Sequence, residues 1–275
     1  MPRARFPVTT GRNAGRLLPI MIVGWVLLAC GGPSSTVTLA LVTTSTTVVP
    51  TTHVEVASDL PLSTTTTGVT AESLPIGSSL VGHATTEVEI FDRPELAAPS
   101  YVLEPATSLG SPRVFLIETG PVDGWVEVSL PIRPNGSSGW VRAGALDLDV
   151  LDYAIFVDLS DRRLRLEQGD EVVLDTEVAV GSPHNPTPTG SYFVTDIVQL
   201  ADPGGPWGPF ALGLSAFSDT ITEFNGGDGI IGIHGTNRPG SIGESVSLGC
   251  VRVPNEIAAQ LAELVKLGTP VEINA

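Results

Sequence analysis

The residues of this chain that could do chemistry are concentrated between Gly232 and Pro254. This stretch contains His234 and Cys250, and Cys250 is the only cysteine outside the first thirty residues. Seven glycines and prolines make the stretch rich in loops, and catalytic groups are often carried by loops on a rigid scaffold. A thiol and an imidazole are the minimum set for acyl transfer through a cysteine. We therefore interpret the pair as a candidate nucleophile and base.

The chemistry of such a pair predicts further roles for the glycines around it. A cysteine attacks carbonyl groups well only as the thiolate, and the imidazole of His234 would accept the thiol proton. The tetrahedral oxyanion formed by attack needs preplaced N–H donors, which we expect from the backbone of Gly249 and Cys250. We expect the carbonyl of Gly235 to hold the second ring nitrogen of His234.

Residue types alone leave an alternative open, in which His234 and Cys250 are both structural. A zinc site is disfavoured, because it needs three or four ligands and the other histidines lie in segments without ligand spacing to one another: His53, His83 and His184. We expect neither a metal nor a cofactor.

The composition excludes one class of partner. The chain has 275 residues, a net charge of −16 and no basic stripe, whereas nucleic-acid binding depends on clustered Lys and Arg. A negative net charge also disfavours an anionic membrane surface, so any attachment to a membrane must have another source.

Residues 1–29 supply that source. A segment with four arginines and no acid precedes an apolar run from Leu17 to Ala29, which is too short to span a bilayer and is typical of a secretory signal. The end of the run, Leu27-Leu28-Ala29-Cys30-Gly31, resembles the lipobox of bacterial lipoproteins. The resemblance implies a lipid anchor on Cys30 and a place in the cell envelope, on the outer face of the cytoplasmic membrane. The alternatives are an ordinary cleaved signal and a Cys30–Cys250 disulfide.

Two segments then precede the reactive stretch. Residues 30–75 are rich in Thr, Ser and Val without an aromatic residue, which predicts a disordered tether, with strand as the alternative. Residues 76–150 alternate between apolar and polar positions and contain an Asn135-Gly136 hairpin signal, which predicts a small all-β domain. Its Gly139-Trp140-Val141 ending resembles bacterial SH3-like domains of cell-wall proteins. That domain would bind the wall or serve only for packing.

Residues 151–275 have the clearest pattern. Strands are expected around Ala154–Asp158, Leu164–Glu167 and Ser191–Thr195, and a last strand at Val271–Ile273. A Gly- and Pro-rich segment with Trp207 and Phe210 is expected to cover a site, although an ordinary surface loop fits equally well. Asn255 is expected to be the N-cap of a short helix that packs on the sheet.

The order of His before Cys resembles the signature of the YkuD-type L,D-transpeptidases. In that pattern a His precedes Ser/Thr-His-Gly-Cys, and here His234-Gly235-Thr236 precedes Ser247-Leu248-Gly249-Cys250-Val251-Arg252. Three further segments are similar to the family: Pro186–Gly190, Gly208–Leu212 and Lys266–Val271. Leu248 departs from the pattern, since many members have His there.

The resemblance, which covers about residues 152–274, implies a mainly β fold. A small SH3-like β-barrel would be followed by a YkuD-type β-rich catalytic domain with a short packed helix. It also implies a cysteine-dependent L,D-transpeptidase that forms 3→3 cross-links between peptidoglycan stem peptides and reacts with carbapenem β-lactams. The substrate-binding residues would be Ser247, Leu248, Arg252, Asn237, Trp207 and Phe210. Arg252 would hold either the loop or a carboxylate, and the structural role is favoured. An L,D-carboxypeptidase that uses water as the acceptor and a non-catalytic wall-binding lipoprotein are the alternatives.

Overall fold

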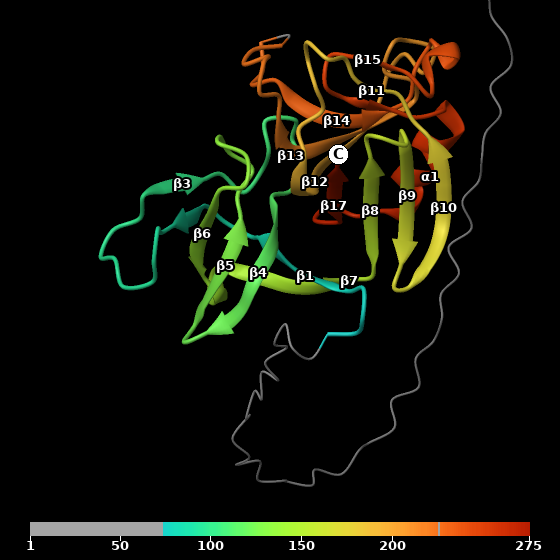
Figure 1. The fold of residues 1–275 in the computed structure, drawn as a ribbon. Helices are drawn as coiled ribbons and strands as arrows, with labels where there is room; N and C mark the ends of the chain where they lie inside the picture. Colours follow the sequence, from blue (N-terminus) through green and yellow to red (C-terminus); the bar gives the residue numbers. More distant parts are fainter. Residues whose placement is uncertain (1–73, 225) are drawn as a thin grey trace, which may run out of the picture. The chain divides into compact units, whose positions relative to one another are not determined.

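The computed structural model describes residues 74–224 and 226–275, and strands dominate both folded parts expected from the sequence (Figure 1). Within these residues the fold is mainly β with a single short α-helix, so the expected fold class is confirmed. The predicted signal peptide at 1–29 and nearly all of the predicted tether at 30–75 lie outside the described residues. The domain boundaries and the SH3-like character of the first part stay predictions. No helix within the described residues is long and apolar enough to cross a bilayer.

The first part of the chain forms a five-stranded antiparallel sheet with the order β6-β5-β4-β1-β7. Its own core is built around Phe115, Val126 and Val141, which are fully buried. Strands β2 and β3 pair with each other in a separate two-stranded antiparallel sheet. The bounds are β1 (Ser79–Ala84), β2 (Val88–Ile90), β3 (Tyr101–Leu103), β4 (Val114–Val122), β5 (Trp125–Ser129), β6 (Ser138–Arg142) and β7 (Leu146–Leu151).

The second part forms a mixed eight-stranded sheet with the order β10-β9-β8-β17-β12-β13-β14-β16. The strands expected from the alternating pattern are present, and β11 pairs separately with β15. The bounds are β8 (Tyr153–Asp158), β9 (Arg163–Gln168), β10 (Glu171–Glu177), β11 (Val180–Gly181), β12 (Gly190–Gln199), β13 (Phe210–Phe217), β14 (Ile230–His234), β15 (Ser245–Ser247), β16 (Val251–Arg252) and β17 (Pro270–Asn274).

Helix α1 (Asn255–Leu264) buries Ala258 and Leu261 in the core of the second sheet. The expected N-cap is wrong by one residue, because Pro254 occupies the cap position and no side chain caps the helix. The Asn255 side chain instead accepts a hydrogen bond from the backbone N–H of Thr236, at 2.7 Å. The start of the helix thereby holds the loop that follows β14.

Candidate active site

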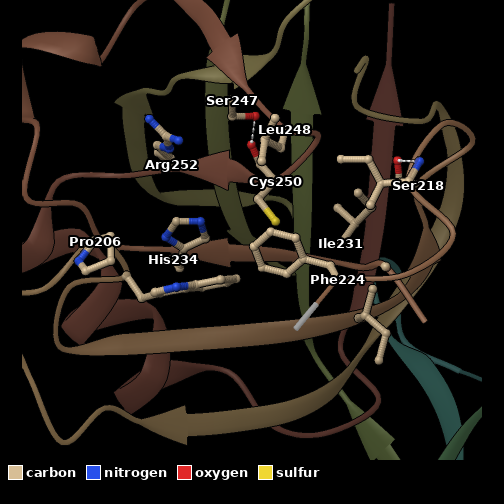
Figure 2. Close-up of a pocket in the computed structure, with 13 residues that line it drawn as sticks. Pro206, Ser218, Phe224, Ile231, His234, Ser247, Leu248, Cys250 and Arg252 are labelled. Atoms are coloured by element: carbon tan, nitrogen blue, oxygen red, sulfur yellow. Dashed lines mark hydrogen bonds between the residues drawn. The ribbon is translucent and has the colours of Figure 1, made fainter. Parts of the chain in front are cut away.

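One pocket of about 340 Å³ contains both residues of the expected catalytic pair (Figure 2). Its lining comes from the segment before β13, from the loop between β13 and β14, from β14, and from β15, β16 and the turn between them. The lining residues are Pro206, Trp207, Ser218, Ile221, Phe224, Gly229, Ile230, Ile231, His234, Ser247, Leu248, Cys250 and Arg252.

Parallel pairing of β14 with β16 explains why residues sixteen apart in sequence meet. The register aligns Ile233 with Val251 and His234 with Arg252. Side chains of directly paired residues point to the same face of a sheet, and residues two apart along a strand share a face. His234, the last residue of β14, and Arg252 therefore lie on one face of the sheet, and Cys250 directly precedes β16 in the turn from β15. Figure 2 shows the sulfur of Cys250 directed into the pocket that His234 also lines.

The His234 ring is fixed in one tautomer. Its Nδ1 lies 2.6 Å from the carbonyl oxygen of Gly235, and a carbonyl can only accept, so Nδ1 carries the proton. In the neutral ring, Nε2 is therefore free to accept a proton. The indole of Trp207 packs against the ring at a centroid distance of 4.5 Å.

Burial keeps His234 neutral. The side chain is only 5% exposed, and this desolvation lowers the pKa of the imidazole from 6.5 to about 4. The bond to Gly235 opposes the shift, and the charge of Arg252 adds to it. At neutral pH the ring is an unprotonated base.

Burial raises the pKa of the nucleophile, whereas it lowers the pKa of the base. Desolvation raises the pKa of the Cys250 thiol, against a backbone hydrogen bond from Gly232 and the nearby charge of Arg252. The resting pair is therefore a neutral thiol beside a neutral imidazole, so proton transfer must accompany attack by the sulfur. Within the described residues Cys250 forms no disulfide, and Cys30 lies outside them.

The turn that presents Cys250 is held from two sides. Ser247 Oγ accepts from the Gly249 N–H at 3.1 Å and donates to the carbonyl of Cys250. Thr187 Oγ1 donates to the carbonyl of Gly249 at 2.8 Å and accepts from the N–H of Gly181 at 2.9 Å. Both hydroxyl-bearing residues are buried. Ser247 thus shapes the turn and also lines the pocket, as expected of a substrate-binding residue.

Glycine is required at position 249. Its φ is +119°, and an added Cβ would lie 2.9 Å from Cδ1 of Ile231. The expected oxyanion role of its N–H is not supported by this arrangement, because that N–H already donates to Ser247 Oγ. The backbone N–H of Cys250 is the remaining candidate of the two.

The other expected substrate-binding residues divide into two groups. Trp207, Arg252 and the half-exposed Leu248 line the pocket. Phe210 does not, because it begins β13 and packs against the core of the second sheet. Asn237 is exposed beside a separate hollow near Pro254.

Several residues of the site were not identified from the sequence. Thr187 belongs to the Pro186–Gly190 segment, whose similarity to the family was the only available signal. Ile221 and Phe224 come from a loop without a motif, and only the folded chain places them in the pocket wall. In the described parts of the chain, no group of three or more His, Cys, Asp or Glu side chains is placed to hold a metal.

The second part of the chain is similar to known proteins. Residues 152–273 match the YkuD family, described as the L,D-transpeptidase catalytic domain. The YkuD protein of Bacillus licheniformis is 36% identical over 151 residues, which cover 52% of this chain and 83% of the relative. The YkuD protein of Bacillus subtilis is 37% identical over 134 residues, covering 49% and 73%. The solved catalytic domain of an E. faecium L,D-transpeptidase has 23% identity and a TM-score of 0.33, covering 44% of this chain and 96% of that one.

Proposed function

This chain belongs to the YkuD family of L,D-transpeptidase catalytic domains, and we propose that it forms 3→3 cross-links in peptidoglycan through a cysteine thioester. The observation that carries the proposal is the placement of Cys250 and a neutral His234 in one pocket. A thiol with a raised pKa needs an adjacent base, and the free Nε2 of His234 is such a base.

In the first half-reaction, Nε2 of His234 takes the thiol proton while Cys250 Sγ bonds to the carbonyl carbon of the third stem residue. The backbone N–H of Cys250 stabilises the oxyanion. The carbon–nitrogen bond to the terminal D-Ala then breaks, and His234 returns the proton to the leaving amine. The product is a thioester between Cys250 and the tripeptide stem.

In the second half-reaction, the side-chain amine of diaminopimelate in another stem attacks the thioester. His234 takes a proton from this amine and delivers it to the departing sulfur, which restores the thiol. The same steps with water as the acceptor would give a carboxypeptidase. Acceptor choice is therefore a question for product analysis.

Arg252 is the proposed anchor for a carboxylate of the stem peptide. It is the single Lys or Arg among the described residues that line the pocket. Its Nε is buried without a hydrogen-bond partner in the described part of the chain. A carboxylate of the substrate would form a charge-assisted bond with the part of this guanidinium that faces the pocket.

The rest of the pocket is suited to the uncharged parts of the stem. Trp207, Phe224 and Leu248 offer apolar surface around the thiol. We propose that Leu248, at 50% exposure, contacts substrate at the rim and affects the fit of the stem more than the chemical step.

The proposal extends to the N-terminal segments. Cys30 would carry the lipid anchor, residues 30–75 would span the distance to the wall, and the first β domain would support wall contact. Globomycin treatment of expressing cells tests the anchor, because it should cause accumulation of the uncleaved precursor. Failure of the wild-type protein to incorporate a labelled fatty acid at Cys30 would contradict the anchor.

A disaccharide-tetrapeptide substrate tests the main proposal directly. The wild-type protein should release D-Ala and form a cross-linked dimer, and mass spectrometry should detect an acyl adduct on Cys250. A carbapenem should give an adduct at the same residue. Cys250→Ala should show neither product nor adduct. Tripeptide without dimer would indicate the carboxypeptidase, and no adduct on folded protein would favour the non-catalytic wall-binding protein.

A further inference from the structure

The loop between β13 and β14 forms one wall of the pocket. It comprises residues 218–224 and 226–229, called the pocket-wall loop below, and it contributes Ser218, Ile221, Phe224 and Gly229 to the lining. Phe224 also packs near Trp207, at a ring distance of 6.2 Å. The position of this loop therefore sets the shape of the space in front of Cys250.

A single side chain from the first β domain ties the two ends of this loop together. The guanidinium of Arg133 donates to the carbonyl of Ser218 at 2.9 Å, of Asp228 at 2.8 Å and of Ile221 at 3.3 Å. Arginine suits this task, because its planar group offers five N–H donors in a fixed arrangement. The guanidinium also lies 5.0 Å from the centre of the Phe217 ring.

Asn135 anchors the strand from which the loop departs. Its side-chain amide donates to the carbonyl of Phe217 at 2.8 Å, and its side-chain oxygen accepts from the N–H of Phe217 at 2.9 Å. Phe217 is the last residue of β13. Arg133 and Asn135 both lie in the connection between β5 and β6, so one hairpin loop of the first β domain makes all these contacts.

The ends of the loop also fit closely against each other. Gly229 has a φ of +67°, and an added Cβ would lie 2.0 Å from the carbonyl oxygen of Ile221. Ser218 Oγ accepts from the N–H groups of Thr220 and Ile221. The carbonyls that face Arg133 are thus held in a defined arrangement, which a guanidinium matches and a neutral side chain could not.

We propose that Arg133, supported by Asn135, is a positioning residue of the active site, through which the first β domain sets the wall of the stem-peptide pocket. The proposal rests on the function proposed above for its substrate class. It assigns the first β domain a role in the reaction in addition to any contact with the wall. The thiol itself does not contact Arg133, so the intrinsic reactivity of Cys250 should not depend on it.

The test compares full-length wild type with Arg133→Ala, Arg133→Lys and Arg142→Ala. Arg142 is the matched control, an exposed arginine of the same domain that lies 4.5 Å from the Trp125 ring, in no bond with the pocket-wall loop. KM and kcat are measured with the disaccharide-tetrapeptide. The alkylation rate of Cys250 by iodoacetamide is measured separately by peptide mass spectrometry.

Arg133→Ala should raise KM roughly tenfold, since it removes three bonds from a charged donor, and should change kcat and the alkylation rate less than about twofold. Arg133→Lys should recover part of the loss, because an ammonium can reach some of the three carbonyls but not all. Arg142→Ala should match wild type. An unchanged KM in Arg133→Ala, an equal loss in Arg142→Ala, or a parallel fall in alkylation would overturn the proposal. If Arg133→Ala does not fold, Arg133→Lys decides.

Hydrogen exchange separates this proposal from the proposed function. Backbone amides of the pocket-wall loop should exchange faster in Arg133→Ala than in wild type, whether or not the protein turns over the tetrapeptide. Faster exchange with an inactive wild type would leave the positioning role supported and refute the transpeptidase. Equal exchange would refute the positioning role even in an active enzyme.

Discussion

At the scale of single residues, the protonation states of two side chains determine how the reaction must begin. A neutral thiol and a neutral imidazole face one pocket, each held neutral by burial. Such a pair differs from a preformed thiolate–imidazolium ion pair, in which the proton has already moved. The difference is measurable through the dependence of rate on pH.

The acid limb of kcat/KM should report the pKa of His234. Since the base must be unprotonated and its pKa is about 4, activity should persist well below 6.5 and halve near pH 4. Steady-state rates across this range check the prediction. A half-maximal point near the ordinary value of 6.5 would contradict the burial argument.

Thr187 should matter through the turn that carries Cys250. Thr187→Val is close in shape but removes the donor to the Gly249 carbonyl and the acceptor for Gly181. We expect a loss of about 1–3 kcal/mol in stability and a lower kcat, because two buried backbone groups lose their partner. Thr195→Val, at another buried threonine, is the control. Equal effects of the two changes on kcat would show that Thr187 does not act through the turn that carries Cys250.

At the scale of elements, the turn from β15 to β16 depends on the backbone of residue 249. Gly249→Ala should lose most activity, because it combines a strained φ with a contact to Ile231, at a cost of about 1–3 kcal/mol. Gly243→Ala is the matched control, since φ is +85° there and no atom lies within 4 Å of an added Cβ. Turnover assays should show a much larger loss for position 249. Similar losses would mean that φ alone, and not the fit against Ile231, is responsible.

The strands and the helix also show which structural features sequence patterns can predict. Alternation of apolar residues predicted the main strands, because a sheet with a buried face imposes that period directly. The alternation of apolar residues does not predict that β14 pairs with β16. The order of His234 before Cys250 at short spacing nevertheless predicted that the two residues belong to one site. Asn255 looked like an N-cap because caps are local, whereas its actual partner is Thr236, nineteen residues earlier.

The same limit applies to the residues around the pair. Thr187, Arg133 and Asn135 act on backbone groups 62 to 95 residues away, and no local pattern encodes such contacts. Asn135 illustrates this well. Its Asn-Gly dipeptide predicted a hairpin, and a hairpin is present, but the asparagine side chain bonds to β13. Phe210 was assigned to substrate because its segment was expected to cover the site, but it packs against the core of the second sheet. Asn237, also assigned to substrate, lies beside a different hollow.

At the scale of the whole molecule, buried His234 makes stability depend on pH. The unfolded chain binds a proton near pH 6.5, and the folded chain does so only near 4. The free energy of unfolding should therefore fall as the pH drops from 6.5 to 4, by about 3 kcal/mol from this residue.

Denaturant titrations of wild type and His234→Gln at pH 8, 6 and about 4.5 test this linkage. The variant lacks the titrating group, so its stability should fall less below pH 6.5, while the two proteins should change in parallel above it. Parallel curves over the whole range would show that His234 does not contribute to acid sensitivity.

A further consequence follows from the protonated sulfur of Cys250. Peroxide and related oxidants attack thiolates far faster than thiols, and the raised pKa leaves little thiolate at rest. The nucleophile becomes strongly reactive only while His234 accepts its proton during attack on a bound carbonyl. Desolvation makes the thiol depend on His234 for deprotonation. Between turnovers, it also protects the sulfur from irreversible oxidation, because the thiol stays protonated.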